Sequence, residues 1–281
     1  MNNLSGALFG ISHVKGLADA FKNSGNHTES RLDISPWSKG GFTTDQGIDF
    51  SYVVGWWDEQ HIGSKPSISE DGVIHYPQRI IELSKHIPDH IGPIFFQLSS
   101  VDSYAAEELI NLGPYDIEPK WDFSSDNQPS KIGRCPVRKI DVDNFVKNTI
   151  KNVLASCITC KYLFPNSKLY YIFSPPPVES DEYIIEKAQA AAHLHPSYME
   201  RYALILKYGI RPFNIRQKLI ELANNQLKQG LQGFGIDYVD PPEACLLPSG
   251  ALDTKYARDM HHGNDLYNIM MMKKISKIIS G

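Results

Sequence analysis

Short apolar runs alternate with amphipathic segments along most of the chain. Apolar runs bounded by turn residues, the pattern of buried strands, occur at 6–11, 31–34, 92–98, 168–173 and 235–240. Segments with apolar residues at three- and four-residue spacing, the pattern of amphipathic helices, occur at 14–23, 77–90, 141–162, 179–206, 212–229 and 264–279. This alternation predicts an α/β fold in which helices cover both faces of a parallel sheet of about five strands.

Two segments do not follow this alternation. Residues 36–76 are rich in glycine and tryptophan, and residues 113–136 combine prolines with the polar stretch SSDNQPS. We expect these segments to be loop insertions, with a small hairpin as an alternative for the first. The chain has 281 residues, of which 42% are hydrophobic, which is enough for one substantial core. We therefore expect residues 1–281 to form a single domain.

The charges of the chain nearly cancel. It has 28 basic and 32 acidic side chains and a formal net charge of -4, so its bulk charge does not favour binding to nucleic acid. No apolar run reaches the ~18 residues that cross a bilayer, and residues 1–20 do not show a basic segment followed by an apolar stretch. We expect a cytoplasmic protein that binds neither membrane nor nucleic acid.

The four cysteines are too few and too scattered for a disulfide framework in a chain of this length. Cys157 and Cys160 form a C-x-x-C pattern, but it lies within a predicted helix and has no histidine nearby. We interpret these thiols as reduced and partly buried, and we expect neither a metal nor a cofactor.

Candidate chemistry lies near the two ends of the chain. The first predicted strand runs into Gly10-Ile11-Ser12-His13 and then directly into a helix, which places Ser12 at the carboxyl end of a strand, where open α/β sheets bind ligands. Asp259 and His262 lie three residues apart just before the last predicted helix. A carboxylate that holds one imidazole nitrogen leaves the other nitrogen available to take the proton of a serine hydroxyl.

Taken together, these motifs resemble those of the SGNH/GDSL hydrolase family. The resemblance implies a flavodoxin-like, three-layer α/β/α fold with Ser12 as nucleophile, His262 as general base and Asp259 as its orienting partner. His261 is a competitor for the base role, although the spacing favours His262. His13 directly follows the serine, and it could line the pocket or stabilise the turn.

The sequence departs from the family pattern at two positions. Ile11 stands where the family usually has aspartate, and Val101 falls where the family has an asparagine that stabilises the oxyanion. The resemblance implies that the Ser12 amide and a glycine amide are the other oxyanion donors. Candidates for the remaining donors are Gly41, with Gly40 as a less favoured choice, and Ser100 or Gln97 in place of the asparagine; the last two could equally be ordinary strand-end residues.

The resemblance implies an esterase that forms an acyl-serine intermediate, and we expect a small acyl ester of a carbohydrate or related metabolite as substrate. An O-acyltransferase that uses a sugar hydroxyl as acceptor would need the same triad. A second hypothesis, from a different class, is a catalytically silent protein that binds carbohydrate or protein, which Ile11 and the missing asparagine motivate. A flavin or nucleotide binder is disfavoured, because GISHVKGL lacks the glycines and hydroxyls of a phosphate loop. The oligomeric state stays open.

Overall fold

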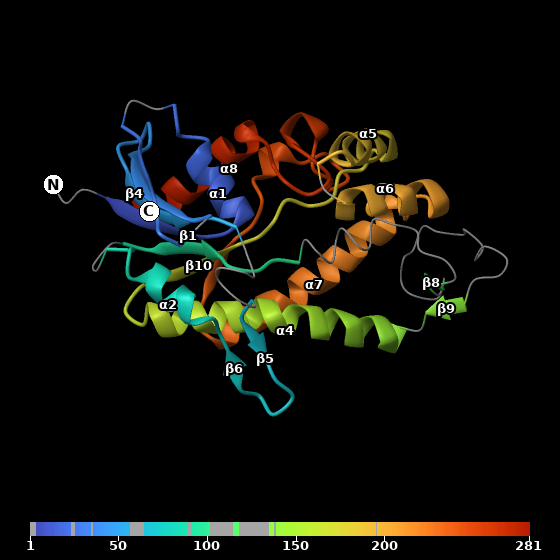
Figure 1. The fold of residues 1–281 in the computed structure, drawn as a ribbon, viewed down its shortest axis with the longest axis horizontal. Coiled ribbons are helices and arrows are strands. Elements are labelled where there is room, and N and C mark those ends of the chain that lie inside the picture. The colour runs from blue at the N-terminus through green and yellow to red at the C-terminus, as the bar shows by residue number, and fades with distance from the viewer. Residues whose placement is uncertain are drawn as a thin grey trace.

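A seven-stranded β-sheet forms the centre of the protein in the computed structural model (Figure 1). The structure describes residues 4–23, 26–34, 36–56, 65–88, 92–101, 115–117, 135–137, 139–194 and 196–281. The strands lie side by side in the order β11-β10-β7-β1-β4-β3-β2. Their bounds are β1 Ser5–Gly10, β2 Thr28–Arg31, β3 Ser38–Thr43, β4 Asp49–Val54, β7 Ile94–Gln97, β10 Leu169–Ile172 and β11 Asp237–Val239.

Five neighbouring strands of this sheet are parallel. β4, β1, β7, β10 and β11 pair in parallel, whereas β2 and β3 join the edge as antiparallel strands. Counted along the chain, the parallel strands have the order 2-1-3-4-5, which is the flavodoxin-like arrangement. The structure thus confirms the α/β class and the expected parallel sheet.

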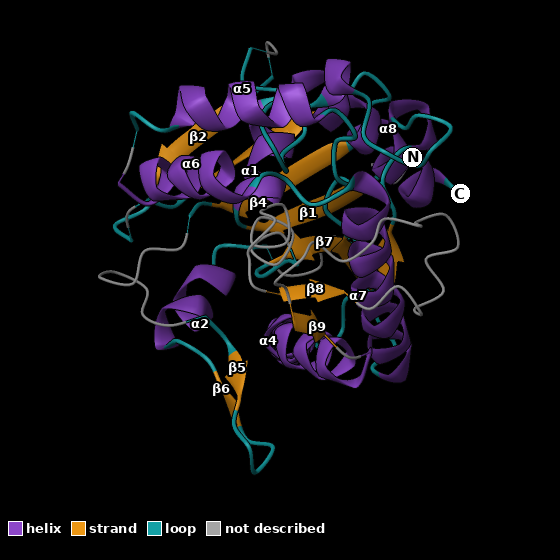
Figure 2. Ribbon diagram, turned by 90° about the vertical axis from the view of Figure 1, so that its right-hand side faces the viewer, coloured by secondary structure: helices purple, strands orange, loops and turns teal. Residues whose placement is uncertain are grey.

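Helices cover both faces of the sheet, as Figures 1 and 2 show. α1 and α8 lie on one face, and α2, α4 and α7 lie on the other; α5 and α6 extend the layer of α1 and α8. The helix bounds are α1 Ser12–Asp19, α2 Gln78–Ser84, α4 Lys139–Leu163, α5 Asp181–Ala191, α6 Pro196–Tyr208, α7 Phe213–Gly233 and α8 Asp265–Ser280.

The alternation of side chains along the strands divides the core in two. Leu8 and Phe95 point toward α1 and α8 and belong to one buried cluster. Their neighbours Phe9 and Phe96 point toward α4 and α7 and belong to the other. Apolar side chains on both faces of a strand are characteristic of a parallel sheet covered on both sides, which explains why these strands read as continuous apolar runs.

The edge of the sheet was predicted wrongly. The run at 31–34 is not a parallel strand, because β2 ends at Arg31 and pairs antiparallel with β3. Residues 36–76 were expected to be a loop or a hairpin insert, but they contain β3 and β4, which belong to the central sheet. The expected hairpin is present as β5 Ser67–Ile68 and β6 Ile74–His75, which projects from the body in Figure 2.

Two further predictions are modified or only partly covered. The helix expected at 179–206 is divided into α5 and α6. Most of the expected insertion at 113–136 lies outside the described residues, apart from β8 Tyr115–Ile117 and β9 Cys135–Val137, which pair in parallel.

The cysteines within the described helices and turns are buried and free of disulfides. Cys157 and Cys160 lie in α4, and Cys245 lies in a short 3-10 helix, Glu243–Cys245. Burial raises the pKa of the Cys157 and Cys160 thiols well above the ordinary value and that of Cys245 to about 11. These thiols are therefore protonated and unreactive at neutral pH. None of the helices described is long and apolar enough to span a membrane.

A buried arginine ties α7 to the segment that follows β10. Arg216 is 2% exposed, and it donates to the carbonyls of Val178 at 2.7 Å and Arg211 at 2.8 Å, and to Asp181 Oδ1 at 3.0 Å. We expect Arg216→Met to lower the free energy of unfolding by about 3 kcal/mol, because the buried carbonyls lose their donors. Urea denaturation measures this change. The control Lys218→Met, at a more exposed position of α7, should change stability by less than about 0.5 kcal/mol; equal losses would contradict the prediction.

Candidate active site

Ser12 lies where the first strand ends and the first helix begins. β1 ends at Gly10, the Ile11 amide donates to the Gln97 carbonyl on β7 at 3.0 Å, and Ser12 is the first residue of α1. The Ile11 carbonyl accepts from the Lys15 amide at 2.9 Å, so the helix starts directly at the carboxyl edge of the sheet. Ser12 is partly exposed, as a nucleophile must be.

The predicted base lies on a tight loop just before α8, which we call the histidine loop (residues 257–263). Ala257 and Gly263 form an antiparallel bridge that closes the loop. The Arg258 amide donates to the His262 carbonyl at 2.8 Å across it. The loop is therefore a compact turn whose side chains have a fixed direction.

Asp259 holds both the backbone and the side chain of His262. Its Oδ1 accepts from the amides of His261 at 3.0 Å and His262 at 2.8 Å. Its Oδ2 lies 2.9 Å from His262 Nδ1. With Nδ1 engaged by the carboxylate, Nε2 is the nitrogen of His262 that can accept a proton.

The electrostatics of the loop keep Asp259 ionised. Burial opposes its ionisation, but the hydrogen bond from His262 and the positive influence of His261 and His262 outweigh burial and hold the pKa of the Asp259 carboxyl well below its usual range. The loop thus carries a fixed negative charge beside the imidazole, which stabilises the imidazolium that forms when His262 takes a proton.

The lowered pKa of Asp259 predicts a pH-dependent contribution to stability. A carboxyl whose folded-state pKa is depressed stabilises the fold above the unfolded pKa of ~3.9, and this contribution is lost as the pH falls toward the folded value. Asp259→Asn should therefore lower the free energy of unfolding at pH 5, and its difference from wild type should narrow below about pH 4. Urea denaturation at the two pH values checks this. The control Asp45→Asn, at an exposed site, should have nearly the same free energy of unfolding as the wild type at both pH values. A loss of stability in Asp259→Asn that is the same at both pH values would contradict the prediction.

Three histidine rings meet near the start of α1. The ring centroid of His13 lies 4.6 Å from that of His262, and the centroid of His261 lies 4.2 Å from that of His262. Because His13 directly follows Ser12, this contact brings the histidine loop to the start of α1. Within the described residues no hydrogen bond joins Ser12 Oγ to either loop histidine; such bonds commonly tighten only when substrate is present.

The histidine loop also packs against helices α5 and α6. Met260 is 6% exposed and packs in a cluster with Ile184 and Ile205. The Tyr183 hydroxyl donates to the Ala257 carbonyl at 3.1 Å. Sequence reasoning missed these supports, because Met260 lies between two polar residues and shows no helical or strand periodicity.

The connection from the histidine loop to α8 is also fixed. Asn264 is the N-cap of α8, where its Oδ1 accepts from the Tyr267 amide at 3.2 Å, and its Nδ2 donates to the Lys255 carbonyl at 2.7 Å. A Cβ at Gly263 would lie 2.2 Å from the Tyr267 side chain. The Gly-Asn-x-x-Tyr pattern after His262 therefore serves to pack the loop closely onto α8.

The structure does not bring Gly40 and Gly41 to Ser12. Both lie inside β3, where Gly40 pairs with Tyr52, whereas the carboxyl end of β1 pairs with Val54. The Gly41 amide donates to Thr28 Oγ1 at 3.1 Å. This placement contradicts the expectation that these glycines contribute to an oxyanion hole. They instead permit close approach of neighbouring strands, since a Cβ at Gly40 would lie 1.9 Å from the Thr28 carbonyl.

Gln97 lies at the expected edge of the sheet but is not available as a donor. It is fully buried, and its Nε2 donates to the Ile172 carbonyl at 2.8 Å and to Ser174 Oγ at 3.2 Å. Its amide thus joins β7 to β10. Ser100 lies three residues beyond β7 and is partly exposed; its role as an oxyanion donor stays a prediction.

The two departures from the family pattern are apolar side chains that face the core. Ile11 is 8% exposed and Val101 is 3% exposed, and both belong to the cluster under α4 and α7.

Asp259, His261 and His262 are the described residues whose grouping could suggest a metal site, since their ligand atoms lie within 4.8 Å of one another. However, Asp259 Oδ2 and His262 Nδ1 are 2.9 Å apart and hydrogen-bonded directly. Zn²⁺ bound to both atoms at ~2.0 to 2.2 Å would hold them about 3.3 Å apart. The contact therefore has the geometry of a hydrogen-bonded acid–base pair.

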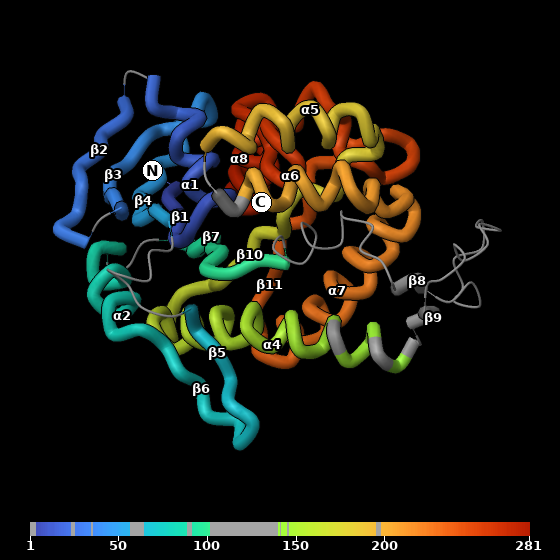
Figure 3. Tube along the Cα trace, turned by 45° about the vertical axis from the view of Figure 1, so that its right-hand side comes forward, coloured from blue at the N-terminus to red at the C-terminus, as the bar shows by residue number. Residues whose placement is uncertain are grey.

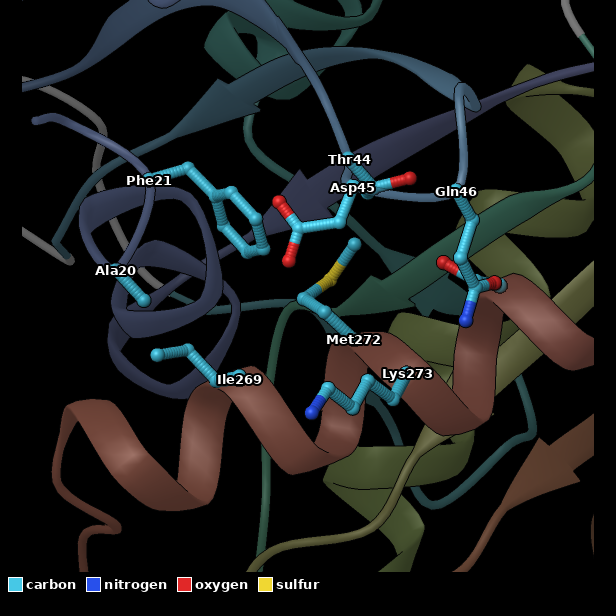
Figure 4. Close-up of a pocket in the computed structure, with 9 residues that line it drawn as sticks. Ala20, Phe21, Thr44, Asp45, Gln46, Ile269, Met272 and Lys273 are labelled. Carbon is cyan, nitrogen blue, oxygen red and sulfur yellow. The ribbon is translucent and has the colours of Figure 1, made fainter. Parts of the chain in front are cut away.

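A cavity of about 190 Å³ lies between α1, the β3–β4 turn and α8 (Figure 4). Ala20 and Phe21, which follow α1, line it together with Asp45, Met272 and Lys273. Because the eight residues of α1 span roughly 12 Å, the cavity and Ser12 lie at opposite ends of this helix. The cavity is thus separate from the candidate active site.

No protein family model matches the sequence, and no curated protein does. Solved structures with likeness to this chain include a GDSL-like lipase from Bacteroides thetaiotaomicron, with 12% identity, a TM-score of 0.40, and coverage of 99% of this chain and 88% of the lipase.

Another structure with likeness to the chain is the periplasmic domain of a lipopolysaccharide acetyltransferase from Salmonella ser. Paratyphi A. It has 12% identity and a TM-score of 0.44, with coverage of 100% of this chain and 85% of that domain. Both TM-scores lie below 0.5.

Proposed function

We propose that the protein is an acyl-ester hydrolase that uses Ser12, His262 and Asp259. The observation that carries this proposal is the 2.9 Å contact between Asp259 Oδ2 and His262 Nδ1, on a loop whose histidine ring lies against His13. A carboxylate that orients an imidazole near a serine is the arrangement that activates a hydroxyl nucleophile.

The residues would act in two steps. Ser12 Oγ attacks the ester carbonyl while its proton passes to His262 Nε2, and the tetrahedral intermediate collapses when the leaving alkoxide takes that proton. An acyl-Ser12 ester remains. In the second step water gives a proton to His262 and attacks the acyl carbonyl, and Ser12 Oγ regains the proton as the acid departs. Asp259 keeps His262 in the required tautomer throughout.

Backbone amides at the start of α1 supply the oxyanion donor in this proposal. Ser12 is the first helical residue, and the first amides of a helix have no partner within it. The positive end of the helix favours a developing negative charge there. Because Val101 stands in place of the family's asparagine, we expect a modest turnover rate.

We propose a small acyl ester of a carbohydrate or related metabolite as the substrate class. Transfer of the acyl group to a sugar hydroxyl would use the same residues, with the acceptor in place of water. We also propose the cytoplasm as the location, which the free cysteines Cys157, Cys160 and Cys245 support.

A silent binding protein is the second candidate. The observation in its favour is that Ile11 and Val101 point into the core, so that neither supplies the polar side chain of the family pattern. Such a protein would keep the fold and bind an ester or glycan without turnover.

Labelling with a fluorophosphonate probe, followed by intact mass measurement, tests the proposal. We expect stoichiometric labelling of the wild type, no labelling of Ser12→Ala, and much slower labelling of His262→Ala. Ser167→Ala, in the turn after α4, is the matched control and should label like the wild type. A folded wild-type protein that does not label would favour the silent binding protein. Release of p-nitrophenol from p-nitrophenyl acetate, with and without sugar acceptors, then separates hydrolysis from transfer.

A further inference from the structure

The outer edge of β2 is an open rim of the central sheet. β2 is the terminal strand in the sheet order, and Thr28, Glu29, Ser30 and Arg31 are all exposed. Figure 3 shows β2 at the margin of the molecule. An open strand edge presents backbone amides and carbonyls that can pair with another strand.

The hydrogen bonds of β2 show which backbone groups face outward. The Leu32 amide donates to the Trp37 carbonyl at 3.0 Å, and the Thr28 carbonyl accepts from the Tyr52 hydroxyl at 3.0 Å. Even-numbered residues of this strand therefore direct their backbone groups inward. Because these groups alternate along an antiparallel strand, Glu29 and Arg31 direct theirs toward the open side.

The charges of Glu29 and Arg31 favour one register for pairing β2 with the β2 strand of a second copy of the chain. In a symmetric antiparallel pair, a two-fold axis at Glu29 or at Arg31 would place like charges opposite each other, which is unfavourable. An axis at Ser30 places Glu29 opposite Arg31 of the partner subunit. By symmetry, Arg31 then lies opposite Glu29 of the partner subunit, so both hydrogen-bonded pairs join opposite charges. Glu29 and Arg31 are two residues apart, so their side chains lie on the same face of the sheet and can form these ion pairs.

We propose that β2 is a self-association edge, at which a second copy of this chain adds antiparallel with Ser30 on the two-fold axis. Arg31 makes no ion pair within the described residues, so its charge is available to the partner. Glu29 lies 3.4 Å from Lys22 and can be shared between this lysine and Arg31 of the partner subunit. The sheets of the two subunits then become continuous. This inference does not depend on the proposed catalytic function.

A short polar edge supports only a transient dimer. Exposed ion pairs contribute little each and are screened by salt, so we expect a Kd of roughly 10⁻⁵ to 10⁻⁴ M that weakens as salt is added. The association should therefore be visible at high protein concentration and low ionic strength.

Sedimentation velocity over a concentration range that brackets ~10⁻⁴ M tests the proposal. Wild-type protein should shift from monomer toward dimer, and Glu29→Arg and Arg31→Glu should each remain monomeric. The double variant carrying both substitutions should dimerise again. An equimolar mixture of the two single variants should form a heterodimer, because all the pairs are then opposite in charge.

The same experiment contains the outcomes that would overturn the proposal. These are a wild-type monomer at all concentrations, or a dimer that persists in both single variants. Circular dichroism and the Tm confirm that the variants are folded, which we expect because both side chains are exposed. Labelling by the fluorophosphonate probe should be the same in all of them, which keeps this test separate from that of the catalytic function.

Discussion

His262→Ala is expected to lower kcat for ester hydrolysis by about 10⁴- to 10⁶-fold, and Asp259→Asn by about 10⁴-fold. In the proposed mechanism His262 takes the Ser12 proton, and the alanine variant has no base at this position. Without the Asp259 carboxylate, the hydrogen bond at Nδ1 no longer fixes the tautomer that leaves Nε2 as the acceptor. Initial rates with p-nitrophenyl acetate measure both changes.

His261→Asn is the matched control for these variants. His261 lies 3.8 Å from Asp259, through Nδ1 and Oδ1, whereas His262 lies 2.9 Å from it. The control should therefore retain far more activity than His262→Ala. The reverse order, with His261→Asn the more damaging change, would assign the base role to His261 and contradict the prediction.

Gly10→Ala is expected to lower the free energy of unfolding by at least about 4 kcal/mol. Gly10 has φ +156°, which L side chains rarely adopt, and a Cβ there would lie 2.3 Å from the Gln97 carbonyl oxygen. The obstacle is the backbone of β7, so a rotamer change cannot relieve it. The strand would have to separate from β7 beneath Ser12. Urea denaturation measures the loss.

The control for Gly10→Ala is Gly233→Ala at the end of α7. A Cβ at Gly233 meets nothing within 4 Å, and its φ is not positive. This variant should be neutral or slightly stabilising, by up to about 1 kcal/mol. If Gly10→Ala proved as stable as Gly233→Ala, the close contact between β1 and β7 would be wrong.

The parallel part of the fold could be predicted because its signals are local. The apolar run that ends before Ser12 identifies β1, and the runs at 92–98, 168–173 and 235–240 contain β7, β10 and β11. The spacing of Asp259 and His262 likewise predicted their contact, since a tight loop brings residues three apart together. Such features depend on a few neighbouring residues.

The antiparallel edge could not be predicted because its signals are not local. Gly40 and Gly41 read as loop residues, yet they lie in β3, where the absence of a side chain lets the Thr28 carbonyl approach. Gln97 has a polar amide that could serve as an oxyanion donor. In the structure this amide donates instead to a carbonyl of β10, more than 70 residues away in sequence. The periodicity of the sequence does not reveal which distant residues these groups contact.

The packing of Met260 connects the histidine loop to two helices outside the sheet. Met260 lies between Asp259 and the two loop histidines, and its side chain is held by Ile184 and Ile205 of the outlying helices α5 and α6. Substitutions that repack these helices would shift the histidine loop, and with it the His262 imidazole. The orientation of the His262 ring therefore depends on helices that lie outside the sheet and are distant in sequence from the histidine loop.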